Sequence, residues 1–143
     1  MKTIIDVVRA VSELAETLFG ERPMTKDVRE GYKRPCSWVE PTMVNTAREG
    51  TLRHDTYQIE IVREGTDTHR GWADLLHWQE TLAQALAEPI KLDAEFFVYP
   101  EDIDFDISRD EMYLQATFTV DLYQIPPDPY AEVMEELELN GKD

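Results

Sequence analysis

Two stretches of the chain repeat apolar residues at the spacing of an amphipathic helix. In residues 4–18 the apolar positions follow the i, i+3, i+4 rule. Thr3 and Asp6 stand three residues apart, as in a capping box, and Gly20 is a typical C-terminal stop. The same periodicity returns in residues 72–86, between a glycine and a proline. We therefore predict two helices.

Three segments between these helices have strand character. Residues 23–28 and 36–40 are short runs, and residues 52–62 alternate apolar with polar side chains, as a half-buried strand does. After the second helix, residues 102–107 alternate aspartates with apolar residues, and residues 112–122 follow after a short turn. This pattern predicts three strands between the helices and a long hairpin after them.

The order α-β-β-β-α-β-β plus a C-terminal tail predicts an α+β fold. We expect a mostly antiparallel sheet of about five strands, with both amphipathic helices packed on one face. The last strand would point five side chains away from the helices: Tyr113, Gln115, Thr117, Thr119 and Tyr123.

A chain of 143 residues is long enough for one hydrophobic core and short for two. Three prolines between residues 126 and 129 are expected to end the folded part. We therefore expect a single α+β domain over residues 1–125 and an acidic C-terminal tail over residues 126–143.

The charge of the chain is strongly negative, at −16. Such a charge repels nucleic-acid phosphates and anionic membrane surfaces, so direct binding to DNA or to a membrane is disfavoured. Residues 95–143 hold 14 of the 30 acidic residues and only 2 of the 14 basic ones. This acidic third is either a surface for a basic partner or simply a solubilising surface.

The single cysteine, Cys36, cannot form an internal disulfide, which is typical of a reducing compartment such as the cytosol. We interpret it as a small buried strand residue. Acidic residues interrupt the apolar start of the chain, residues 1–19, so neither a signal peptide nor a membrane span is expected there.

Calcium binding is the one metal chemistry that the acidic residues suggest. Positions 1, 3, 5 and 9 of a calcium loop would be Asp102, Asp104, Asp106 and Asp110. However, Ile107 replaces the required glycine and Tyr113 the bidentate glutamate. A solvated strand explains the same residues, so we expect no metal site.

Enzymatic chemistry has no motif in this sequence. His54, His69 and His77 lack the His-Glu-x-x-His pairing, and the six glycines are scattered singly rather than in a phosphate loop. We place His77 on the second helix and the other two histidines near strand ends. No catalytic residue, cofactor or enzymatic activity is therefore predicted.

Two segments are candidate contact surfaces. Tyr32, Lys33, Arg34 and Pro35 form a basic stretch that could dock on the acidic part of another copy, giving contacts that close into a ring. The alternative is an ordinary connection with solvated charges.

The acidic tail is the second candidate contact. Its apolar residues, Met134, Leu137 and Leu139, are too few for a core and could dock on a neighbour. The alternative is a frayed terminus.

With these residues in view, the chain resembles the tail terminator proteins of tailed phages and prophage elements. The likeness covers most of the chain and lies in four segments in order. They are the helix that starts at Met1–Val8, the stretch Gly31–Cys36, the strand that ends Val120-Asp121-Leu122-Tyr123, and the ending from Met134 to Gly141.

The resemblance implies a structural virion protein without catalytic activity. Its subunits would form a ring of six at the head-proximal end of the tail tube, stop tube polymerisation and join the tail to the head through the connector or neck protein. Assembly would take place in the cytoplasm of the bacterial host. If Asp102, Asp104 and Asp106 line the bore, they would repel passing DNA, because DNA binding depends on lysine and arginine.

Two rival functions stay open. A neck or head-completion protein of the phage connector would share small α+β subunits and acidic rings. An acidic DNA mimic that inhibits a nucleic-acid enzyme would share the small size and the charge.

Overall fold

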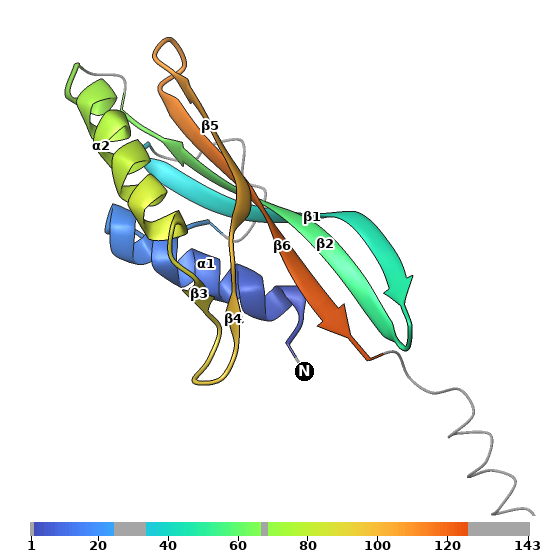
Figure 1. Cartoon of the computed structure of the whole chain (residues 1–143). Helices are drawn as coiled ribbons and strands as arrows, with labels where there is room; N and C mark the ends of the chain where they lie inside the picture. The colour runs from blue at the N-terminus through green and yellow to red at the C-terminus, as the bar shows by residue number, and fades with distance from the viewer. Residues whose placement is uncertain (1, 25–33, 67–68, 126–143) are drawn as a thin grey trace, which may run out of the picture.

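The structure is a computed structural model and describes residues 2–24, 34–66 and 69–125 (Figure 1). The elements are α1 (Ile4–Phe19), β1 (Cys36–Glu49), β2 (Leu52–Glu64), α2 (His69–Leu86), β3 (Ile90–Lys91), β4 (Phe97–Val98), β5 (Glu101–Ser108) and β6 (Tyr113–Gln124). The α+β class is confirmed, with a four-stranded antiparallel sheet and a small two-stranded one.

Local signals set the ends of α1, as predicted. The Thr3 backbone N–H donates a hydrogen bond to the Asp6 carboxylate over 2.9 Å, which completes one half of the capping box. At the other end Gly20 adopts a left-handed conformation with φ of 77°, and its N–H bonds to the Glu16 carbonyl. The predicted helix is therefore confirmed at both ends.

The large sheet has the strand order β1-β2-β6-β5, and every neighbouring pair is antiparallel. β1 and β5 are therefore its two edges. Gly50, with φ of 63°, lies in the tight connection between β1 and β2, where a left-handed conformation favours glycine. This strand order brings residues that are far apart in the chain next to each other, because β2 pairs along its length with β6.

Both helices pack on one face of the large sheet, as predicted (Figure 1). The core forms because the inward positions of β2 and β6 carry apolar side chains that meet the apolar stripes of the helices. Its fully buried members include Val7 and Val11 of α1, Leu75 and Leu82 of α2, and Phe118 of β6.

The number and length of the strands differ from the prediction. Between the helices the described residues contain β1 and β2; of the predicted strand 23–28, only Pro23 and Met24 lie within them, and Met24 makes a single bridge to Trp38. β1 runs on from Glu40 to Glu49 because the β2 partner strand supplies hydrogen bonds there. β3 and β4 were not predicted, since two-residue strands show no periodicity.

Candidate assembly surfaces

The face of the large sheet opposite the helices is here called the open sheet face. It carries acidic side chains of the strands, whereas the strand arginines lie on the other face. The register places eight acidic side chains on this face: Glu40, Glu49, Glu60, Glu64, Glu101, Asp104, Asp106 and Asp121. The arginines of these four strands, Arg48, Arg53 and Arg63, all lie on the side of the helices. The open sheet face is thus a carboxylate surface without a strand lysine or arginine.

A β-bulge in β1 contributes to this separation. The register shifts between Met43 and Asn45, so that odd-numbered residues after the bulge lie on the face that even-numbered residues occupy before it. Glu49 therefore lies on the open sheet face, where it contacts His54, and Arg48 lies on the other face. Without the bulge, these two charges would exchange faces.

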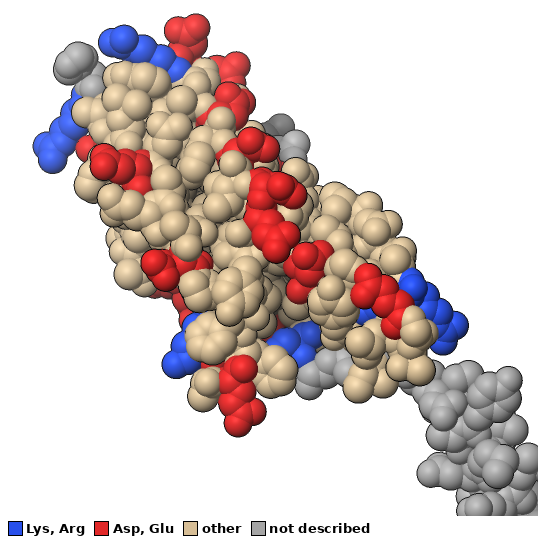
Figure 2. Space-filling model, viewed as in Figure 1, with Lys and Arg blue, Asp and Glu red and all other residues tan. Residues whose placement is uncertain are grey.

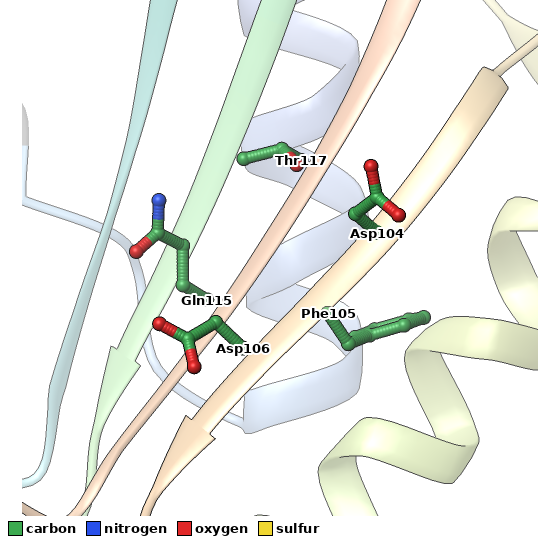
Figure 3. Close-up of a pocket in the computed structure, with 5 residues that line it drawn as sticks. All are labelled: Asp104, Phe105, Asp106, Gln115 and Thr117. Carbon is green, nitrogen blue, oxygen red and sulfur yellow. The ribbon is translucent and has the colours of Figure 1, made fainter.

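The predicted lumen residues lie at the exposed edge strand β5. Asp104 and Asp106 are beside Gln115 and Thr117 of β6 around a shallow hollow of about 110 Å³ (Figure 3). Asp102 is exposed in an irregularity at the start of β5 and has φ of 50°. The three aspartates are thus solvent-exposed, and in Figure 2 the carboxylates follow one another along this side of the molecule.

Hydrogen bonds hold part of this acidic surface in place. The Tyr113 hydroxyl donates to the Asp106 carboxylate over 2.8 Å, and this bond raises the pKa of Tyr113. The predicted outward side chains of β6 lie on the open sheet face, as their pairing with β2 and β5 requires. These polar residues suit a surface in contact with water or a polar partner.

His54 and its hydrogen-bond partners occupy the other end of the open sheet face. His54 bonds through Nε2 to the Asp121 carboxylate over 2.8 Å and through Nδ1 to Glu49 over 3.2 Å. The pKa of His54 is raised, first by the bond to Asp121 and then by the bond to Glu49. Thr56 donates a further hydrogen bond to Asp121. His54 thus lies near a strand end, as predicted, whereas His69 begins α2, which corrects its predicted place near a strand end.

The predicted basic contact stretch is described only at its end. Tyr32 and Lys33 lie outside the described residues. The Arg34 guanidinium bonds within its own subunit, to the Glu64 carboxylate at 3.3 Å and to the Glu111 carbonyl at 3.2 Å. Pro35 follows a cis peptide bond. The docking of this stretch on another copy stays a prediction.

An aromatic surface at one end of the molecule was missed by the sequence reasoning. Phe96 and Phe97 are 45% and 47% exposed, and they line a pocket together with Tyr123 at the end of β6. Two adjacent phenylalanines between prolines, outside any helical or strand period, were the available signal. The tail residues Met134, Leu137 and Leu139 lie outside the described residues.

Other chemistry is limited in the described part of the chain. Groups of three or more side chains that could hold a metal ion are absent there. Cys36 is buried at the start of β1, as predicted, and burial together with Glu64 raises the pKa of its thiol to about 11. Neither described helix is long and apolar enough to span a membrane.

Comparison with known proteins places the chain in a family. No curated protein matches it. The family model described as phage tail terminator protein matches residues 6–132, which is most of the chain and includes α2, both sheets and all of α1 except its first two residues. The protein therefore belongs to the phage tail terminator family and is a structural component of the virion tail.

Proposed function

We propose that this protein forms a ring of six subunits at the head-proximal end of the tail tube. The ring stops polymerisation of the tube and offers the surface to which the connector or neck protein of the head is joined. One ring face pairs with the last ring of tube subunits, and the opposite face lacks a matching surface, so growth ends there.

The observation that carries this proposal is the separation of charge across the large sheet. The strand arginines lie on the helix side and the eight carboxylates on the open sheet face. With that face towards the bore, DNA meets an excess of carboxylates, because the one arginine bound there in the described part of the chain, Arg34, is paired with Glu64; the DNA then passes without specific binding. Asp102, Asp104 and Asp106 are then lumen residues at the edge of each subunit.

The contacts between subunits follow from the two segments predicted to dock. Tyr32, Lys33, Arg34 and Pro35 face an acidic surface of the neighbouring copy, and the tail residues Met134, Leu137 and Leu139 pack on a neighbour. Residues 1–125 act as the folded unit and residues 126–143 as an appended acidic tail. An exposed edge strand supports assembly as well, since residues 40–49 of β1 are exposed and their outer edge is unpaired within the described strands.

Tube length measures the proposed function directly. Tail tube protein is polymerised with increasing amounts of this protein, and electron microscopy measures the tube lengths and the ring at the tube end. We expect shorter tubes that carry one ring at one end. Unchanged tube lengths at excess protein would contradict the terminator function. Binding to the portal or its adaptor instead of the tube protein would favour the neck alternative, and a monomer that binds a basic enzyme would favour the DNA mimic.

The lumen assignment has its own test. Asp104→Asn with Asp106→Asn should increase DNA retention by the ring, most at low salt, because two repulsive charges are removed per subunit. The matched control is Glu13→Gln with Glu16→Gln on the exposed side of α1, which removes the same charge elsewhere. Equal retention by both variants across a salt series would exclude β5 from the bore.

A further inference from the structure

An exposed apolar surface lies where β6 ends beside the β3–β4 hairpin. We name it the apolar end patch and define it by Phe96, Phe97, Tyr123 and Ile125, whose side chains are between 45% and 67% exposed. Phe96, Phe97 and Tyr123 line a pocket of about 230 Å³. Figure 1 shows the hairpin, the start of the chain and the end of β6 at the same end of the molecule. A cluster of large exposed apolar side chains around a pocket is typical of an interaction site.

Hydrogen bonds and one ion pair connect the segments that carry the patch. Asp93 accepts hydrogen bonds from the backbone N–H groups of Glu95 and Phe96, which fixes the hairpin turn. Its other carboxylate oxygen pairs with Lys2 at 2.6 Å. Gln124 donates to the Lys2 carbonyl over 2.7 Å, so the start of the chain, the hairpin and β6 are tied together. Such connections reduce the conformational entropy that is lost when a partner binds.

The chain itself contains an apolar segment that could occupy this surface. Residues 126–143 follow directly after Ile125, and they carry Met134 and Leu137 at the i, i+3 spacing with Leu139 nearby. Glutamates flank these apolar residues. Lys91 lies opposite Phe97 in the hairpin, and Lys2, which is paired with Asp93, lines the pocket together with Asp121. The apolar side chains of the pocket match Met134 and Leu137, and Lys91 beside Phe97 is the cation that can meet the flanking glutamates.

The occupant is the segment of a second copy rather than that of the same chain. Pro126, Pro127 and Pro129 directly follow Ile125 in the sequence, and proline-rich stretches in general favour extended chain over tight reversals. Met134 stands nine residues after Ile125, and a return to the patch of its own chain would require a reversal within this proline-rich stretch. A neighbouring subunit offers the same patch without a reversal of the chain.

We propose that the C-terminal segment of one copy docks on the apolar end patch of a second copy, with Met134 and Leu137 against Phe96 and Phe97. This inference rests on the proposed assembly of copies and adds the surface that receives the tail. It requires no tube protein, so it can be tested separately from the terminator function.

Disulfide trapping between two copies of the full chain tests the docking. A tagged copy carries Phe97→Cys and an untagged copy carries Leu137→Cys; a mild oxidant is added to the mixture. We expect a tagged–untagged dimer. The control replaces Phe97→Cys by Leu76→Cys on α2, whose side chain is similarly exposed at 44% and lies outside the patch. Equal trapping by the control would overturn the proposal. A chain that carries both Phe97→Cys and Leu137→Cys and forms the disulfide only within itself would overturn it as well.

Charged substitutions supply the second measurement. Phe97→Asp and Leu137→Asp should each weaken self-association about tenfold, and together no more than either one alone, because both remove the same contact. Phe97 is half exposed, so the fold should be retained, which circular dichroism checks. Unchanged self-association with lost binding of tube protein would assign the patch to the tube and overturn the proposal. If the two copies are trapped as expected but added protein leaves the tube length unchanged, only the terminator function is rejected.

Discussion

The imidazole ring of His54 stacks on the phenol ring of Tyr123, with centroids 4.5 Å apart and planes 10° apart. The two residues are directly opposite each other in the β2–β6 pairing, although they are 69 positions apart in the chain. Asp121 and Glu49 hold the two ring nitrogens of His54. The histidine is thus fixed in a carboxylate environment next to the apolar end patch.

This environment makes the stability of the protein depend on pH. The pKa of His54 is raised in the folded state, so its protonation favours folding. The gain is complete below the unfolded pKa of about 6.5 and is lost as the pH rises through the raised folded value. We expect His54→Gln to lower the melting temperature at about pH 6, with the difference closing at higher pH. Thermal melts across this range measure it. His77→Gln, on the exposed side of α2, is the control; a His54→Gln effect that does not change with pH would contradict the assignment.

Asp55 should have the opposite pH dependence. Its carboxylate accepts hydrogen bonds from Thr46 over 2.6 Å and from Arg53, which lower its pKa in the folded state. Stability from Asp55 is therefore present above the unfolded pKa of about 3.9 and is lost as the pH falls through the lowered folded value. Asp55→Asn should lower the urea midpoint of unfolding at about neutral pH and have little effect in strong acid. The exposed turn residue Asp110, changed to Asn, should have no such effect.

Arg63 is expected to be important for stability. Its side chain is 1% exposed, and its guanidinium lies 4.3 Å from the Trp78 ring centroid and 5.0 Å from that of Phe19, with Glu21 at 2.9 Å. Arg63→Ala should lower the free energy of unfolding by about 3 kcal/mol through lost packing and cation–π contacts. Glu21→Gln should cost less than Arg63→Ala, because the Glu21 side chain is 43% exposed and glutamine keeps an oxygen that can accept a hydrogen bond from Arg63. Urea denaturation measures both, and equal losses would show that the ion pair alone matters.

Gly71 provides a test in which packing opposes helix propensity. In an exposed helix position, alanine in place of glycine stabilises by roughly 1 kcal/mol. A Cβ at Gly71 would overlap the carbonyl oxygen of Thr66, so Gly71→Ala should instead destabilise by about 1–3 kcal/mol. Ala83→Gly, at an exposed position of the same helix, measures the ordinary propensity. A stabilising Gly71→Ala in urea denaturation would contradict the structure.

The thiol of Cys36 should react slowly in the folded protein. Burial and the nearby Glu64 raise its pKa to about 11, so the reactive thiolate is scarce at neutral pH. A thiol reagent should label the native protein far more slowly than the urea-unfolded protein. A reagent that releases a coloured product on reaction lets absorbance measure the two rates. Rapid labelling of the native protein would show that the start of β1 is accessible to solvent.

Much of the fold was predictable because its signals are local. A helix repeats every 3.6 residues and a strand every two, and α1 and the β5–β6 hairpin carry clear periodicities with turn residues at their ends. β1 was predicted too short because residues 40–49 are exposed on both faces, and a strand without a buried face shows no alternation. The aromatic hairpin residues gave no periodicity either, so the apolar end patch was not found.

Local patterns in the amino-acid chain were therefore enough for the α+β class, the two amphipathic helices and the excess of acid in the last third. The tertiary structure was needed to show that the strand carboxylates share one face, that the arginines lie behind it, and that Phe96 and Phe97 meet Tyr123. The physical reason is that sheet pairing joins residues distant in sequence. A single bulge or strand neighbour sets the face on which each side chain lies.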